Sequence, residues 1–210
     1  MQKWIVLISH FLKKALRKPF GSDSYYSSQE SFLYLYNLSD EVAGPVASAA
    51  YQMFFVSSVT ELDQALEGKK LEDAVFEKYM RLNIGKNSQV LLIFKGADLA
   101  HYSWVARGWN AYIFDEYFSE IDFKQEAHVG PCVTYKEFRG EGLYPIALTE
   151  ICRKLKEEAL LSKISIRTLT TNTPSIKGVC KSPFNLVGKL LESNMFFMSF
   201  FKVQPQSQIE

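Results

Sequence analysis

The sequence predicts a single α/β domain of the α+β type, preceded by an N-terminal extension. Its 210 residues, 47% of them hydrophobic and 14% aromatic, are enough for one sizeable core. Strand-like and helix-like stretches alternate from Phe32 onward, and an interrupted strand, a glycine turn and a long helix follow one another between residues 127 and 155. We therefore divide the chain into a basic amphipathic segment with a polar linker (1–31), one domain (32–205) and a polar tail (206–210).

The charge balance and the cysteines argue against several classes of protein. Lys and Arg number 24 and Asp and Glu 23, which leaves a net charge of +1. Neither this balance nor any zinc-finger, RNP-type or helix-turn-helix pattern favours nucleic acid as a partner. Cys132, Cys152 and Cys180 lie far apart and form no C-x-x-C pair. They predict neither a disulfide framework nor a metal site, and a reducing cytoplasm fits them best.

The first 21 residues carry five basic residues and no acidic one. The apolar run 4–8 is too short to span a bilayer, and the basic cluster follows it, unlike in a signal peptide. On a helix, one face of residues 1–20 is apolar and most of the basic residues lie elsewhere. Such a helix can lie flat on an anionic membrane, or it can pack on its own domain or on a partner chain. Residues 21–31 are expected to be a polar linker.

The domain is expected to contain strands and helices in a definite order. Alternation and composition predict strands at 32–38 and 51–58, helices at 59–66 and 69–82, a hairpin that turns at Lys95–Asp98, a strand at 127–135, a helix from Leu143, a strand at 162–170, a short helix at 175–181, and strands at 184–191 and 195–203. Gly130-Pro131 inside the strand at 127–135 predicts a bulge or a local break in pairing. The apolar run 195–201 is either a homodimer contact or buried core.

The turn before the helix at Leu143 lacks an ordinary helix cap. Ser, Thr, Asp or Asn would serve there, but the sequence has Gly140 and Gly142 on either side of one acidic residue, with Arg139 before them. Small residues let phosphates approach the unpaired N–H groups of a first helical turn, so we expect this turn to hold a pyrophosphate. Arg139 can contact a phosphate, cap the preceding strand, or pair with Glu137 or Glu141. No G-K-[ST] of a P-loop is present, and the third glycine of a dinucleotide fingerprint is missing.

This stretch, Arg139-Gly140-Glu141-Gly142-Leu143-Tyr144, resembles the Arg/Gln-x-x-Gly-x-Gly/Ala signature of the GNAT N-acetyltransferases. The resemblance continues through Asn172, Ser175 and Lys181-Ser182-Pro183-Phe184, and it covers roughly residues 127 to 190. It implies the acyl-CoA N-acyltransferase fold: a mixed, mostly antiparallel sheet of about seven strands, flanked by helices, with a bulged fourth strand. It also implies acetyl-CoA as co-substrate and no metal.

The resemblance assigns coenzyme contacts to particular residues. The pyrophosphate turn would comprise Arg139, Gly140, Glu141, Gly142, Leu143 and Tyr144. Val133 and Thr134 would offer backbone groups to the pantetheine arm, and Asn172 and Ser175 would contact the coenzyme from the next strand's end. Asn172 is also a common turn residue, and Ser175 is also a common helix cap, so both assignments have a structural alternative.

Four residues, Tyr144, Val179, Ser182 and Pro183, depart from the family pattern. Tyr144 replaces the last Gly or Ala, which crowds the phosphate side, and Ser182-Pro183 replaces the usual small residue and glycine. The tyrosine that many members use as general acid falls on Val179, which cannot donate a proton. Another group such as Tyr135 or Cys180 would then serve, or the thiolate leaves without a dedicated acid.

The implied reaction is acetyl transfer from acetyl-CoA to a primary amine. Glu126 and His128, just before the bulge, are the candidate bases, and Tyr135 is a candidate acid. Glu126 can equally be a solvated strand-end carboxylate, and His128 an ordinary sheet residue. His101 and Trp104 can shape the acceptor pocket or belong to an ordinary strand. No base paired with Cys132 is apparent, which argues against a covalent nucleophile.

The acceptor is the least defined part of the prediction. RGEGLYPIAL together with NTPSIKGVCK resembles bacterial GNAT members that accompany surface-polysaccharide synthesis, which implies an amino-sugar nucleotide as a small-molecule acceptor. One alternative is transfer of another acyl or aminoacyl group on the same fold. A second is a coenzyme A-binding regulatory module without turnover, which Val179 and the Ser-Pro change would suit.

Overall fold

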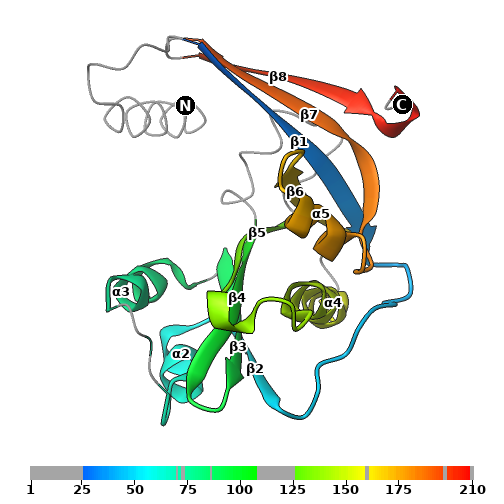
Figure 1. The fold of residues 1–210 in the computed structure, drawn as a ribbon. Coiled ribbons are helices and arrows are strands. Elements are labelled where there is room, and N and C mark those ends of the chain that lie inside the picture. The colour runs from blue at the N-terminus through cyan, green and yellow to red at the C-terminus, as the bar shows by residue number, and fades with distance from the viewer. Residues whose placement is uncertain are drawn as a thin grey trace.

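One mixed sheet of eight strands forms the centre of the molecule, in the order β2-β3-β4-β5-β6-β1-β7-β8 (Figure 1). The computed structural model describes residues 26–69, 71, 74–85, 87–107, 126–158, 161–195 and 198–208. The amphipathic segment predicted for residues 1–20 lies outside this part of the chain. Within it, no helix is long and apolar enough to cross a membrane.

The elements follow the predicted order. The strands are β1 (Tyr26–Asn37), β2 (Tyr51–Val56), β3 (Ser88–Lys95), β4 (Asp98–Arg107), β5 (Glu126–Thr134), β6 (Lys163–Leu169), β7 (Asn185–Met195) and β8 (Met198–Pro205). The helices are α2 (Val59–Ala65), α3 (Ala74–Asn83), α4 (Leu143–Lys156) and α5 (Thr173–Val179), with short 3-10 helices η3 (Lys136–Phe138) and η4 (Gln206–Gln208). The predicted α+β class and the mostly antiparallel sheet are confirmed, since among the described strands only β5 and β6 pair in parallel.

The sheet has the eight strands that the local sequence patterns predict, one more than the resemblance implied, and its first strand begins earlier than expected. Residues 26–31, expected as linker, form the first half of β1, and residues 26–30 pair with 191–195 of β7. This pairing partner is far away in the sequence, so the polar stretch gives no local signal of a strand. Because β1 comes first, the bulged strand β5 is fifth along the chain, although it is fourth across the sheet.

Helices cover both faces of the sheet, α4 and α5 on one and α2 and α3 on the other (Figure 1). The predicted apolar stripe of α4, which includes Leu143, Ala147, Ile151 and Leu155, is buried in the core on the first face. On the second face, Leu62 and Met80 pack with apolar side chains of β3 and β4. Strands β1, β7 and β8 run together as a long ribbon away from α2 and α3.

Candidate functional site

The two parallel strands β5 and β6 separate halfway along their length. They pair from Glu126–Lys163 to Val129–Ile166 and no further. Beyond that point β5 stays paired with β4, whose register against β5 shifts between Ser103–Cys132 and Val105–Val129. Two residues, Gly130 and Pro131, therefore lie opposite Trp104, which is the predicted bulge. We call the gap between β5 after Val129 and β6 after Ile166 the slot.

The ladder pattern shows which backbone groups face the slot. The Tyr135 N–H donates to the Ala100 carbonyl at 3.0 Å, so the alternation of an antiparallel pair also turns the Val133 backbone groups toward β4. The backbone N–H and C=O groups of Cys132 and Thr134, which alternate with those of Val133, then point into the slot. Of the two strand residues predicted to meet the pantetheine arm, Thr134 is therefore oriented for it, whereas Val133 is not.

The glycine turn lies at the end of the slot, between η3 and α4. Gly140 (φ 88°) and Gly142 (φ 75°) both adopt the left-handed region, where glycine carries no steric penalty. A Cβ added to either would meet nothing within 4 Å, so the turn is open on its outer side. Gly142 caps α4 without a side-chain hydrogen bond. Among the hydrogen bonds of the described residues, none uses the N–H of Gly140 or of the next four residues. These are free donors at the positive end of a helix dipole.

Arg139 and Glu141 fix the turn to its surroundings. The Arg139 Nε donates to the Thr134 carbonyl at 3.2 Å, which ties the turn to the slot-facing edge of β5. The Glu141 carboxylate accepts from the Tyr51 hydroxyl and lies 3.0 Å from the Lys95 Nζ. The glutamate is therefore held toward the β2–β3 side of the turn, with its charge balanced by a lysine.

Asn172 and Ser175 both have structural roles. The Asn172 side chain caps α5, because its oxygen accepts from the Ser175 N–H at 3.2 Å. The Ser175 hydroxyl lies 3.3 Å from the Tyr144 hydroxyl. The structure thus makes Asn172, rather than Ser175, the helix cap, and it places the Ser175 hydroxyl next to that of Tyr144.

A buried histidine, His101, supports the slot-facing strand. Its Nδ1 is 2.7 Å from the Thr134 Oγ1, and its Nε2 is 2.7 Å from the Ser103 Oγ. Burial lowers its pKa to about 3, so the ring is neutral and bridges β4 and β5. The sequence offered both His101 and Trp104 as acceptor-pocket residues or as ordinary strand residues. In the structure His101 is a buried strand residue on the α4 face, and Trp104 lies in the core of the other face. This supporting role of His101 depends on its pairing with Thr134 on the neighbouring strand, and the sequence alone could not reveal that pairing.

The two predicted bases lie on the sheet face opposite α4. Burial, with the nearby Arg167 charge, lowers the pKa of His128 to about 3, and its Nδ1 is 3.0 Å from the Ser165 Oγ. Glu126 is 4% exposed, with an oxygen 4.0 Å from the Lys163 Nζ. It lies roughly 13 Å of strand before Gly130. His128 is therefore the nearer of the two to the slot, but it binds a proton only weakly.

The remaining candidates lie around the bulged strand. The Tyr135 ring packs 6.4 Å from that of Tyr102, on the α2 and α3 face. Burial raises the pKa of the Cys132 thiol to about 12, so little thiolate forms at neutral pH and the sequence argument against a nucleophile is strengthened. Val179, in the position of the family's acid, is fully buried in the α4-side core.

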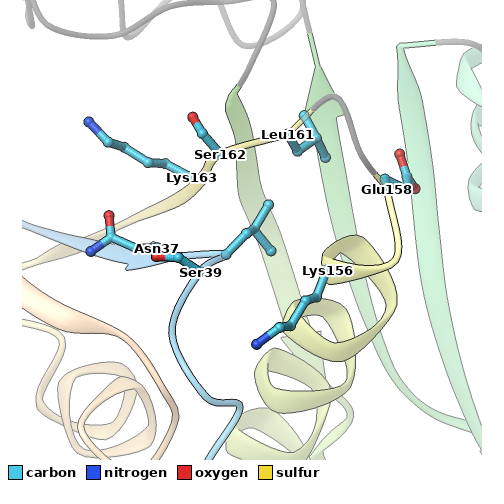
Figure 2. A pocket seen from close by; sticks show the side chains of 8 residues that line it. Asn37, Ser39, Lys156, Glu158, Leu161, Ser162 and Lys163 are labelled. Carbon is cyan, nitrogen blue, oxygen red and sulfur yellow. The ribbon is translucent and has the colours of Figure 1, made fainter.

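A shallow pocket at the far end of α4 is separate from the slot (Figure 2). The end of β1, the last turn of α4 and the start of β6 line it. Its charged groups already have partners in the protein, since Lys156 donates to the Asp40 carbonyl and Glu158 pairs with Arg107. Helix α4 is roughly 20 Å long, which separates this pocket from the glycine turn.

No protein-family model and no functionally curated protein matches the sequence. Solved structures match the fold. A tandem GNAT protein from the clavulanic acid biosynthesis pathway has a TM-score of 0.52 at 16% identity, over 75% of this chain and 50% of that one. A Drosophila protein from a structural genomics programme has a TM-score of 0.54 at 10% identity, over 90% and 57%. A GCN5-related N-acetyltransferase-like protein from Streptococcus suis has a TM-score of 0.51 at 8% identity, over 89% and 66%.

The eight-stranded mixed sheet matches these solved structures in its architecture: the chain has the GNAT fold, as the resemblance implied. The chain spans only about half to two thirds of the lengths of these three structures.

Proposed function

We propose that the protein transfers an acetyl group from acetyl-CoA to a primary amine. The observation that carries this proposal is the slot between β5 and β6, which ends at a turn with open backbone donors. GNAT-titled neighbours of the same fold support acyl transfer as the general activity.

The residues present suit an acyl-CoA. The free N–H groups that follow Arg139, at the start of α4, suit a pyrophosphate, and the Arg139 guanidinium adds a charge-assisted donor. The pantetheine arm is extended and carries two amides. It can therefore lie in the slot as an added strand and pair with the backbone of Cys132 and Thr134. Thr134 is also held by His101 and Arg139, so this edge is rigid.

The bulged strand would supply the chemistry. A backbone N–H in the slot can polarise the thioester carbonyl while the amine attacks from the face opposite α4. The C–N bond forms, the C–S bond breaks, and the coenzyme leaves as a thiolate that takes up a proton. Because the pKa of His128 is low, we assign loss of the ammonium proton to water or to Glu126 through water, and we retain Tyr135 as the candidate acid.

We further propose an amino-sugar nucleotide as the acceptor, on the resemblance of the 140–149 and 172–181 stretches alone. A cytoplasmic protein that meets the membrane peripherally through its basic, apolar residues 1–20 would suit such an acceptor. A homodimer contact at 195–201 remains part of the proposal. The side chains of that run, like residues 1–20, lie outside the described part of the structure.

The first test is calorimetric titration with acetyl-CoA of the parent and of Gly142→Glu. The substitution puts bulk and negative charge into the open turn, so binding of about micromolar strength in the parent should be lost. Gly68→Glu is the matched control, because Gly68 also has a positive φ (69°), is exposed, and would give its Cβ nothing to meet within 4 Å. If the folded parent protein does not bind acetyl-CoA, the proposal is wrong.

Turnover separates the proposal from its alternatives. Acetyl transfer predicts release of free thiol when an amine is supplied. Preference for another thioester in the same assay would favour transfer of a different acyl group. Coenzyme binding without thiol release, across a panel of amines that includes amino-sugar nucleotides, would favour a regulatory module.

A further inference from the structure

Tyr144 connects the first turn of α4 to α5. Its hydroxyl lies 3.3 Å from the Ser175 hydroxyl. Its ring packs so closely on Gly178 that a Cβ there would lie 2.4 Å from the Tyr144 Cδ1. The ring also lies near His101, at 6.1 Å between centroids. We call this arrangement of Tyr144, Ser175 and Gly178 the Tyr144 bridge.

The Tyr144 bridge lies over the slot. Helix α4 packs on β3, β4 and β5, whereas α5 packs on β6, and both helices are on the same face of the sheet (Figure 1). The junction of the two helices is therefore above the gap where β5 and β6 separate. A side chain that reaches from α4 to the backbone of α5 must cross this gap.

No second group fits between the Tyr144 ring and Gly178. The ring touches the α5 backbone directly, because Gly178 has no side chain to intervene. An extended arm as thick as a polypeptide backbone could pass between the helices here only if the ring moved. Burial also raises the pKa of Tyr144, so the phenol stays protonated and its hydrogen bond with Ser175 persists at neutral pH.

We propose that Tyr144 sets the affinity for the coenzyme by occupying the path of the pantetheine arm, and that the ring must leave α5 before the arm enters the slot. This inference rests on the proposed function. Only the fraction of molecules with the ring displaced can bind the coenzyme. The free energy of the Tyr144 bridge therefore reduces the observed free energy of coenzyme binding. Removing the ring should tighten binding, the opposite of the effect expected for a residue that contacts the coenzyme.

The test compares two probes on three variants. Coenzyme A carries the pantetheine arm, whereas 3′-phospho-ADP carries the phosphates without it. Tyr144→Leu keeps apolar bulk on α4 but cannot reach Ser175, Tyr144→Ala removes the side chain, and Tyr144→Phe keeps the ring. Two shortened variants are included in case one does not fold, which circular dichroism will show. Tyr79→Leu, at a half-exposed tyrosine of α3 on the other face, is the control.

We expect the shortened variants to bind coenzyme A at least about tenfold more tightly than the parent, with Tyr144→Phe, which loses only the Ser175 contact, in between and Tyr79→Leu near the parent value. Affinity for 3′-phospho-ADP should not change, because that probe stops at the glycine turn. An unchanged or weaker affinity of a folded shortened variant for coenzyme A overturns the inference, and so does an equal gain for both probes.

The same data keep this inference apart from the proposed function. If parent and variants bind 3′-phospho-ADP but shortening Tyr144 gains nothing for coenzyme A, the inference fails and the turn stands. If no folded form of the protein binds either probe, the proposed function fails and the inference fails with it.

Discussion

Arg139 carries positive charge at the mouth of the slot. Its Nε is committed to the Thr134 carbonyl, so the guanidinium is oriented while its outer nitrogens remain available to a phosphate. A charge-assisted hydrogen bond contributes about 1.5–3 kcal/mol, so we expect Arg139→Ala to weaken acetyl-CoA binding about 10- to 100-fold in calorimetry. Arg153→Ala is the control, because Arg153 lies on α4 and pairs with Glu150 away from the turn. Equal affinities of Arg139→Ala and the parent would contradict this role.

The residues of the site also show the limit of motif matching. Asn172 and Ser175 occupy the expected positions, yet the Asn172 side chain caps α5 and the Ser175 hydroxyl contacts that of Tyr144. The identity of a polar residue gives its hydrogen-bonding capacity, but not the partner that uses it. Tyr144 is the clearest departure from the family pattern, and its contacts with Ser175 and Gly178 are visible only in the structure.

At the scale of elements, β8 pairs with β7 and approaches it very closely at Gly188. A Cβ at this position would lie 2.7 Å from the Gln204 carbonyl oxygen, a backbone atom that cannot turn aside. We expect Gly188→Ala to destabilise the protein by about 1–3 kcal/mol, the usual cost of overpacking, measured by urea denaturation. Gly85→Ala is the matched control, because its Cβ would meet nothing within 4 Å. Equal stability of the two variants would contradict a tight contact at Gly188.

For the whole molecule, two buried histidines predict how stability depends on pH. His101 and His128 both have a pKa of about 3 in the folded protein, against about 6.5 in an unfolded chain. Below pH 6.5 the unfolded state therefore binds more protons than the folded state. Stability should fall by about 1.4 kcal/mol per pH unit for each histidine, and this loss should end near pH 3.

Urea denaturation at pH 7.5, 6.0 and 5.0 measures this slope. His128→Asn and His101→Asn should each remove about half of the decline between pH 6.0 and 5.0, whatever they do to stability at pH 7.5. A variant with the parent's slope would show that its histidine is not buried in neutral form.

The sequence by itself determined most of the elements and the glycine turn. Hydrophobic periodicity located the α4 stripe, the turn Lys95–Asp98 between two β-forming runs located the hairpin, and Gly130-Pro131 located the bulge in β5. These features depend on neighbouring residues and on backbone preferences, which a local stretch of sequence carries in full.

Only the tertiary structure decided the rest. It placed β1 between β6 and β7, turned the Val133 backbone away from the slot, paired His101 with Thr134, and brought Tyr144 onto Gly178. Each of these facts is a contact between segments far apart in the chain. Such contacts follow from strand register and helix packing, and a side chain's identity does not specify which distant partner it meets.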